Sequence, residues 1–330
     1  KKGRSMFTFN NKTVLITGGT GSFGKKFTEI ILKRYKPKRL IIYSRDELKQ
    51  YDMQKLFKVY KNIRFFIGDV RDKDRLLMAF HDVDFVLHAA ALKQVPAMEY
   101  NPTEAIKTNT IGAMNIINAA IERNVKKVIA LSTDKACNPI NLYGATKLCA
   151  DKLFIAGNSY SGRAKTAFSV VRYGNVAGSR GSVVPFFTQK IKEGVLPITD
   201  KRMTRFFITL DQAVGFVIKC FEIMHGGELF VPRISSVRIA ELARVMAPEC
   251  KIKFTGIRPG EKLHEAMISE DDARNTLEFK DYYIVKPSFP GWNDKNHYKG
   301  KSAPDGFRYS SDMNKNWLEG KKLKEFLKLI

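Results

Sequence analysis

Short apolar runs alternate with helical patterns through the first half of the chain. The runs are rich in Val, Ile, Leu and Phe and too short for helices, so we predict buried strands at residues 12–17, 39–43, 63–70, 84–88, 126–132 and 168–171. Between them, apolar residues recur at helical spacing, as at Phe23, Phe27 and Ile30, and along a long amphipathic helix at 101–123. This alternation predicts an α/β fold with a doubly wound parallel sheet.

The regular alternation ends near residue 180, where a glycine- and serine-rich loop follows the sixth strand. We therefore predict a Rossmann-like, dinucleotide-binding domain at 8–180, to which some later segments return, and a smaller C-terminal substrate domain at 181–330. The basic segment Lys1–Ser5 is not followed by an apolar region, so we expect a disordered lead rather than a signal peptide.

The composition is ordinary for a soluble globular protein. Hydrophobic residues make up 44% of the 330 residues, charged residues make up 27%, and no apolar run approaches the length of a membrane span. The four cysteines (Cys137, Cys149, Cys220 and Cys250) lack Cys-x-x-Cys spacing and the density of a secreted scaffold. We therefore predict no metal site and expect a reducing, cytoplasmic location.

A formal net charge of +24 is the unusual feature. Such a charge suits either a polyanion ligand or a lysine-rich surface on an enzyme that binds phosphates. Lys and Arg are spread along the whole chain, and no alternation of aromatic and basic residues accompanies them. This pattern argues against nucleic acid as the main partner, because base-stacking surfaces interleave the two residue types.

A glycine-rich turn connects the first strand to the first helix. Its candidate cofactor-binding residues are Gly18, Thr20, Gly21, Ser22, Phe23 and Gly24. Glycines permit the tight bend and let a pyrophosphate approach backbone N–H groups at a helix N-terminus. Because a strand precedes this turn and a helix follows it, we predict a dinucleotide site.

The ends of the next strands add further candidates for the same site. Ser44 and Arg45 follow the second strand and favour a 2′-phosphate, and therefore NADP, whereas Asp46 keeps NAD open or caps the next helix. Asp69 would meet the adenine or cap a turn. The remaining candidates are Lys49, Val70, the small residues Ala89, Ala90 and Ala91, the cation Lys93, and Asn109, which ties the cofactor-side loops or makes a buried hydrogen bond.

The segment after the fifth strand carries the candidate chemistry. Thr133, Asp134 and Lys135 stand at the carboxyl end of that strand, where open parallel sheets bind ligands. Tyr143 and Lys147 are four residues apart and share a helix face, so the ammonium would lower the pKa of the phenol. A hydroxyl, a carboxyl, two amines and a phenol that meet at one place predict acid–base catalysis.

These motifs, taken together, resemble the extended short-chain dehydrogenase/reductases, and most closely the inverting UDP-N-acetylglucosamine 4,6-dehydratases of the pseudaminic acid pathway. The resemblance is carried by Thr17–Gly24, Tyr43–Gln50, Ala89–Lys93, Leu131–Lys135, Tyr143 with Lys147, Arg172–Val176, Gly178–Pro185, Met203–Phe206 and Arg258–Lys262. The Asp134–Lys135 pair is typical of the branch that inverts C5. Gln94 departs from the histidine of many such members and is similar to capsule-synthesis relatives, which in turn lack Tyr143.

The resemblance implies a mechanism that uses a bound nicotinamide cofactor and UDP-N-acetylglucosamine. Tyr143 and Thr133 would act at the sugar O4. Lys135, desolvated and therefore able to be neutral, would take the C5 proton, and Asp134 would protonate the leaving C6 hydroxyl. The substrate-binding candidates are Lys93, Asn175, Ser182, Val183, Thr199, Met203, Arg205, Arg258 and Glu261. The resemblance also implies a homo-oligomer, either a dimer or a hexamer.

Two other functions fit parts of the pattern. A UDP-sugar 4-epimerase would share the glycine turn, Tyr143 and Lys147, but would have no use for the Asp134–Lys135 pair. A non-catalytic NADP-sensing or RNA-binding relative would use the charge of +24, but would have no reason to keep the acid, the base and the phenol together.

Overall fold

A ten-stranded sheet forms the centre of the molecule in the computed structural model, which describes residues 7–179, 181–288, 297 and 299–330. Its strand order is β16-β14-β15-β10-β6-β5-β4-β1-β2-β3. Seven strands are parallel, namely β1 (Thr13–Thr17), β2 (Arg39–Ser44), β3 (Ile63–Ile67), β4 (Phe85–His88), β5 (Lys127–Thr133), β6 (Ala167–Tyr173) and β10 (Leu229–Pro232). Antiparallel pairing adds β15 (Tyr282–Val285), β14 (Thr276–Glu278) and β16 (Lys301–Ser302).

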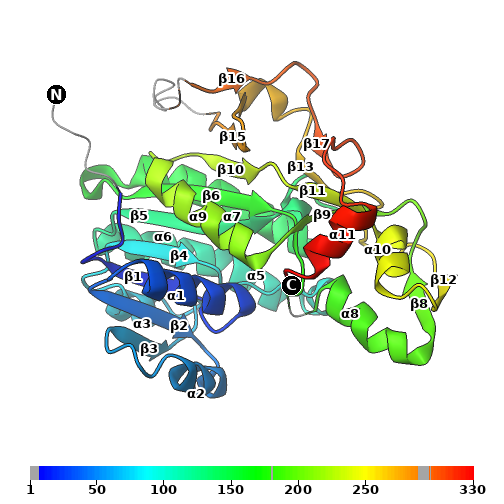
Figure 1. Ribbon diagram of the computed structural model, residues 1–330. Helices are drawn as coiled ribbons and strands as arrows, with labels where there is room; N and C mark the ends of the chain where they lie inside the picture. Colours follow the sequence, from blue (N-terminus) through cyan, green and yellow to red (C-terminus); the bar gives the residue numbers. More distant parts are fainter. Residues whose placement is uncertain (1–6, 180, 289–296, 298) are drawn as a thin grey trace.

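Helices cover both faces of this sheet (Figure 1). On one face lie α1 (Ser22–Arg34) and α9 (Leu210–Ile223), and on the other lie α3 (Lys73–Ala79), α6 (Gly112–Glu122) and α7 (Leu142–Tyr160). Three further helices follow strands β2 and β4, namely α2 (Glu47–Leu56), α4 (Val95–Tyr100) and α5 (Pro102–Ile106). The predicted α/β fold with a doubly wound parallel sheet is therefore confirmed.

A second group of elements lies beyond the carboxyl ends of the parallel strands (Figure 1). It comprises α8 (Val183–Lys190), β8 (Val195–Ile198), α10 (Ile239–Met246), β12 (Lys251–Phe254) and α11 (Gly320–Leu327), which share a hydrophobic cluster of their own. Two smaller sheets accompany it. One pairs β7 (Asn175–Val176), β9 (Thr204–Ile208) and β11 (Ser235–Arg238), and the other pairs β13 (Ala266–Ile268) and β17 (Tyr309–Ser310). Arg180, at the predicted domain boundary, and Lys1–Ser5 lie outside the described residues.

Two sequence predictions about these elements are wrong in detail. The third strand ends at Ile67 rather than Val70, because the Tyr43 ring occupies the space beside Gly68 and its hydroxyl donates to the Asp69 carbonyl at 2.9 Å. The helix predicted at 101–123 is interrupted by a π-helical turn, η1, at Lys107–Ile111. Within this turn Asn109 bonds to other segments, and such π-turns recur at functional sites.

An aromatic cluster joins the N-terminal segment to the sheet. The buried Phe9 ring lies 5.2 Å from Tyr35, 5.7 Å from Phe85 and 5.5 Å from Phe221, in edge-on arrangements. Phe9 therefore links the end of α1 with β4 and α9. Within the part of the chain that the structure describes, no helix is both long and apolar enough to cross a membrane.

Phe9→Ala is expected to lower the free energy of unfolding by about 3–5 kcal/mol, because it leaves a cavity among these rings. Urea unfolding followed by circular dichroism measures this change. The matched control is Phe186→Ala on α8, where the ring is 41% exposed and the expected loss is about 0.5 kcal/mol. Equal losses in the two variants would contradict the prediction.

Candidate active site

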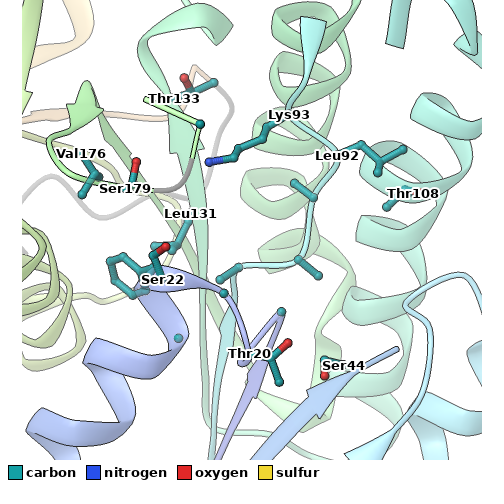
Figure 2. Close-up of a pocket in the computed structure, with 18 of the residues that line it drawn as sticks. Thr20, Ser22, Ser44, Leu92, Lys93, Thr108, Leu131, Thr133, Val176 and Ser179 are labelled. Atoms are coloured by element: carbon teal, nitrogen blue, oxygen red, sulfur yellow. The ribbon is translucent and has the colours of Figure 1, made fainter. Parts of the chain in front are cut away.

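A cavity of about 1040 Å³ opens at the carboxyl ends of the parallel strands. Figure 2 shows Lys93 extending into it toward the region of Thr133 and Ser179, while Thr20 and Ser44 lie at the other end. The sequence-predicted residues that line it are Gly18, Thr20, Gly21, Ser22, Phe23, Gly24, Ser44, Arg45, Asp46, Lys49, Asp69, Val70, Ala89, Ala90, Ala91, Lys93, Thr133, Asp134, Lys135, Tyr143, Lys147, Asn175 and Ser182. One cavity thus unites the cofactor candidates with the catalytic candidates.

The glycine turn has the geometry that a dinucleotide requires. Gly18 has a φ of +65°, and a Cβ there would lie 2.8 Å from the Ala90 nitrogen. A Cβ on Gly24 would lie 2.2 Å from the Gly19 carbonyl oxygen, so only glycine lets α1 start this close to β1. Gly21 is the N-cap of α1 and supplies no side-chain cap, which leaves the helix N–H groups directed at the cavity. These residues fit a pyrophosphate.

Cations pair with Asp46, which follows β2, and with Asp69, which follows β3. Asp46 caps α2 by accepting from the Lys49 N–H at 2.9 Å, which is one of the two roles that the sequence left open for it. Burial alone would raise the pKa of Asp69, but hydrogen bonds from Arg71 and the charge of Arg45 lower it. Arg45 itself is 56% exposed beside the cavity, so a cation stands where the adenosine ribose would be read.

Asn109 lies behind the cavity and does not line it. Its side chain accepts from the Leu92 N–H at 2.9 Å, donates to the Leu92 carbonyl at 3.0 Å and donates to the Thr146 hydroxyl at 3.1 Å. These bonds join η1, the loop after β4 and α7. The alternative of a polar tie between loops therefore describes Asn109 better than direct contact with a cofactor.

The catalytic candidates meet because α7 begins directly against the loop after β5. A short 3₁₀ turn, η2 (Asp134–Ala136), leaves β5, and Asn141 caps α7 by accepting from the Gly144 N–H at 2.8 Å. A Cβ on Gly144 would lie 2.1 Å from the Lys135 carbonyl oxygen. Glycine therefore permits the contact that brings Tyr143 beside Thr133 and Lys135.

Burial and neighbouring charges act on the phenol of Tyr143 and on the amine of Lys147. Burial raises the pKa of Tyr143, and the influences that lower it are the Lys135 charge and a hydrogen bond with Thr133. Burial lowers the pKa of Lys147, although Asp151 acts against this. Lys135 and Thr133 thus act on the Tyr143 pKa in this structure, and the same effect of Lys147 stays a prediction.

Lys135 lies between two carboxylates. Its Nζ is 3.0 Å from Asp134 Oδ1 and 3.4 Å from Glu265 Oε1. Burial alone would lower the pKa of Lys135, but these two carboxylates outweigh it and raise that pKa above its usual range. The sequence predicts that burial makes Lys135 able to be neutral, whereas in this structure the two carboxylates favour its ammonium form. Glu265 was not predicted from the sequence. Its only sequence signal is that it follows Arg258–Lys262, and its contact with Lys135 forms only when the chain folds.

Several substrate-binding candidates do not line this cavity: Val183, Thr199, Met203, Arg205, Arg258 and Glu261. Arg205 is buried and donates to the carbonyls of Thr204, Lys262 and Leu263, so it holds the segment that carries Glu265. Arg258, which is 73% exposed, pairs with Glu261 at 2.9 Å. Thr199 contacts the Met203 sulfur at 3.1 Å. Their roles toward a substrate stay predictions.

Three matches describe the relatives of this chain. A curated "UDP-N-acetylglucosamine 4,6-dehydratase (inverting)" of Campylobacter jejuni is 57% identical over 328 residues, which cover 97% of this chain and 98% of the relative. A protein named "UDP-glucose 4-epimerase" from Rickettsia conorii is 44% identical over 285 residues, covering 84% and 83%. The solved structure of DesIV, a dTDP-glucose 4,6-dehydratase from Streptomyces venezuelae with NAD bound, matches with a TM-score of 0.68 and 20% identity over 76% of this chain and 86% of that one.

The last match shows the fold alone, whereas the first two show common descent along most of the chain. The family model described as "Polysaccharide biosynthesis protein" matches residues 14–287, which include the glycine turn, Lys135, Tyr143 and Glu265. The chain therefore belongs to this polysaccharide biosynthesis family of the extended short-chain dehydrogenase/reductases, as its motifs predicted.

Proposed function

We propose that the protein is an inverting UDP-N-acetylglucosamine 4,6-dehydratase that uses NADP. The observation that carries this proposal is the convergence of a carboxyl (Asp134), an amine (Lys135) and a phenol (Tyr143) in the cavity that also contains the glycine turn. The name and 57% identity of the Campylobacter jejuni relative support the same reaction.

A nicotinamide dinucleotide held by the glycine turn would supply the chemistry that removes a hydride from the sugar C4 and returns one at C6. Tyr143 takes the O4 proton, and Thr133, which bonds to the phenol, orients the same oxygen. The resulting ketone acidifies the C5 hydrogen, which Lys135 removes. Asp134 then protonates the departing C6 hydroxyl.

The surroundings of Asp134 suit this last role. Its Oδ1 accepts from Thr133 at 3.0 Å and from Lys135 at 3.0 Å. Its Oδ2 is buried and has no hydrogen-bond partner among the described residues. Oδ2 is therefore the oxygen on which a proton for the leaving hydroxyl would be carried.

The second candidate is a UDP-sugar 4-epimerase, which the Rickettsia conorii relative's name favours. An epimerase needs only the cofactor cradle and a base at O4, so it leaves the Asp134–Lys135–Glu265 arrangement without a role. The dehydratase uses all of these groups, and we therefore prefer it.

Incubation with UDP-N-acetylglucosamine in heavy water, followed by proton NMR, tests the function. The expected product shows a new C6 methyl signal, deuterium at C5 and L-arabino couplings, because C5 is deprotonated and reprotonated on the opposite face. D-xylo couplings would retain the dehydratase and reject inversion. Formation of UDP-N-acetylgalactosamine alone would establish the epimerase.

Arg45→Ala is expected to weaken NADP binding about 10-fold, or about 1.4 kcal/mol, because the guanidinium would pair with the 2′-phosphate. NAD binding is expected to change less than about 2-fold, and isothermal titration calorimetry measures both. Arg64→Ala, at an exposed arginine outside the cavity, serves as the control. An equal loss for the two nucleotides would reject the NADP assignment.

Gly144→Ala is expected to lower kcat about 100-fold, because the new Cβ would push the first turn of α7 away from Lys135 and displace Tyr143. Steady-state kinetics of the same dehydration measures the effect. The control, Gly215→Ala on α9, adds a Cβ that meets nothing within 4 Å and is expected to leave kcat unchanged. A Gly144→Ala enzyme with normal turnover would show that this close contact is not needed.

A further inference from the structure

The state of Lys135 poses a chemical problem for the reaction. Its Nζ lies within 3.0 Å of Asp134 and 3.4 Å of Glu265, and both carboxylates favour the ammonium form. An ammonium cannot remove the C5 proton, because nitrogen needs a free electron pair to act as a base. The Lys135 proton must therefore move to another group before the C5–H bond breaks.

Glu265 is placed to receive that proton. It directly precedes β13, and its side chain is 2% exposed. Because it does not line the cavity, it would act on a bound substrate only by way of Lys135. One of its oxygens, Oε1, faces Lys135. The other, Oε2, is buried without a hydrogen-bond partner among the described residues. Burial raises the pKa of this carboxyl, which eases its protonation.

The other charged groups around Glu265 limit this effect without cancelling it. Arg205 Nε lies 3.8 Å from Oε1 and Lys262 Nζ lies 4.0 Å from Oε2, and both cations favour the carboxylate. Asp134 acts in the opposite direction by its negative charge. Lys135, the two carboxylates and these two cations thus make a compact assembly in which a proton can shift without a change in net charge.

The backbone that carries Glu265 is also fixed in place. The Glu265 N–H donates to the Ser311 hydroxyl at 3.0 Å. Two residues later, the Met267 carbonyl accepts from the buried Arg172 at 2.9 Å, and Arg172 pairs with Asp151 of α7 at 3.1 Å. Because α7 also carries Tyr143 and Lys147, Glu265 is held in register with the catalytic helix.

We propose that Glu265 is the proton-holding partner of Lys135 in the dehydration step, a positioning residue that acts through the lysine. This inference rests on the proposed function. One proton passes from Lys135 Nζ to Glu265 Oε1, which leaves a neutral amine and a neutral carboxylic acid. The amine then takes the C5 proton, a new N–H bond forms, and the electron pair of the broken C–H bond enters the enolate of the 4-ketone.

This arrangement has a consequence for pH dependence. The ammonium–carboxylate pair and the amine–acid pair contain the same number of protons, so their ratio does not change with pH. The rate of C5 deprotonation is therefore expected to be level between the two macroscopic pKa values of the pair. If Lys135 instead lost its proton to solvent, the rate would rise tenfold per pH unit below its pKa.

The decisive experiment compares wild type and Glu265→Gln in kcat for UDP-N-acetylglucosamine dehydration over about pH 6 to pH 8.5. Wild type is expected to give a level profile. Glu265→Gln is expected to be about 100-fold slower at pH 7 and to rise tenfold per pH unit, because Asp134 still favours the ammonium. The variant should still oxidise C4, so reduced nicotinamide accumulates while deuterium enters C5 slowly.

The matched control is Glu270→Gln, at an exposed glutamate of the same segment, which should behave as wild type. Equal slowing of Glu265→Gln at every pH would show a merely structural role and overturn the inference, as would turnover at or above the wild-type rate. A tenfold rise in the wild-type kcat per pH unit would by itself overturn the inference. Wild type that forms no 6-deoxy product would reject the proposed function instead.

Discussion

The close contact between the first turn of α7 and the loop after β5 is the constraint on which the rest of the site depends. Gly144 lies so near the Lys135 carbonyl that any side chain would part the two segments. Because of this contact, a phenol on a helix and an amine on a 3₁₀ turn face the same cavity. The approach of Tyr143 to Lys135 thus depends on the absence of a side chain at position 144.

Buried charge then connects this local contact to distant parts of the chain. Lys135 pairs with Asp134 beside it and with Glu265, and Asp151 of α7 pairs with Arg172 of β6. Removing one member of such a pair would leave an uncompensated buried charge, which is strongly destabilising. Each pair therefore fixes the separation of its elements, and the segment at β13 cannot move without disturbing the catalytic turn.

The sequence predicted the parts of the molecule that depend on local patterns. Six of the seven parallel strands, the glycine turn and the helix that carries Tyr143 and Lys147 follow from periodicity and from residues such as Gly18 and Asn141 that bond or bend within their own segment. The missed features depend on contacts between segments. The π-helical turn follows from the bonds of Asn109 to Leu92 and Thr146, and the charged state of Lys135 follows from Glu265. Contacts between distant segments leave no periodic pattern in the sequence.

This division also separates the general part of the site from the specific part. The cofactor cradle is made mainly of backbone, from glycines and a helix N-terminus, so any chain that keeps the turn can keep the cradle. The acid–base assembly is made of side chains from the end of β5, η2, α7 and the segment before β13, and each charge in it affects the others. Loss of Glu265 would leave the cradle intact but change the proton affinity of Lys135. Under the proposed function, the choice of reaction within this fold therefore depends on how buried carboxylates distribute protons around a lysine, while the dinucleotide site stays the same.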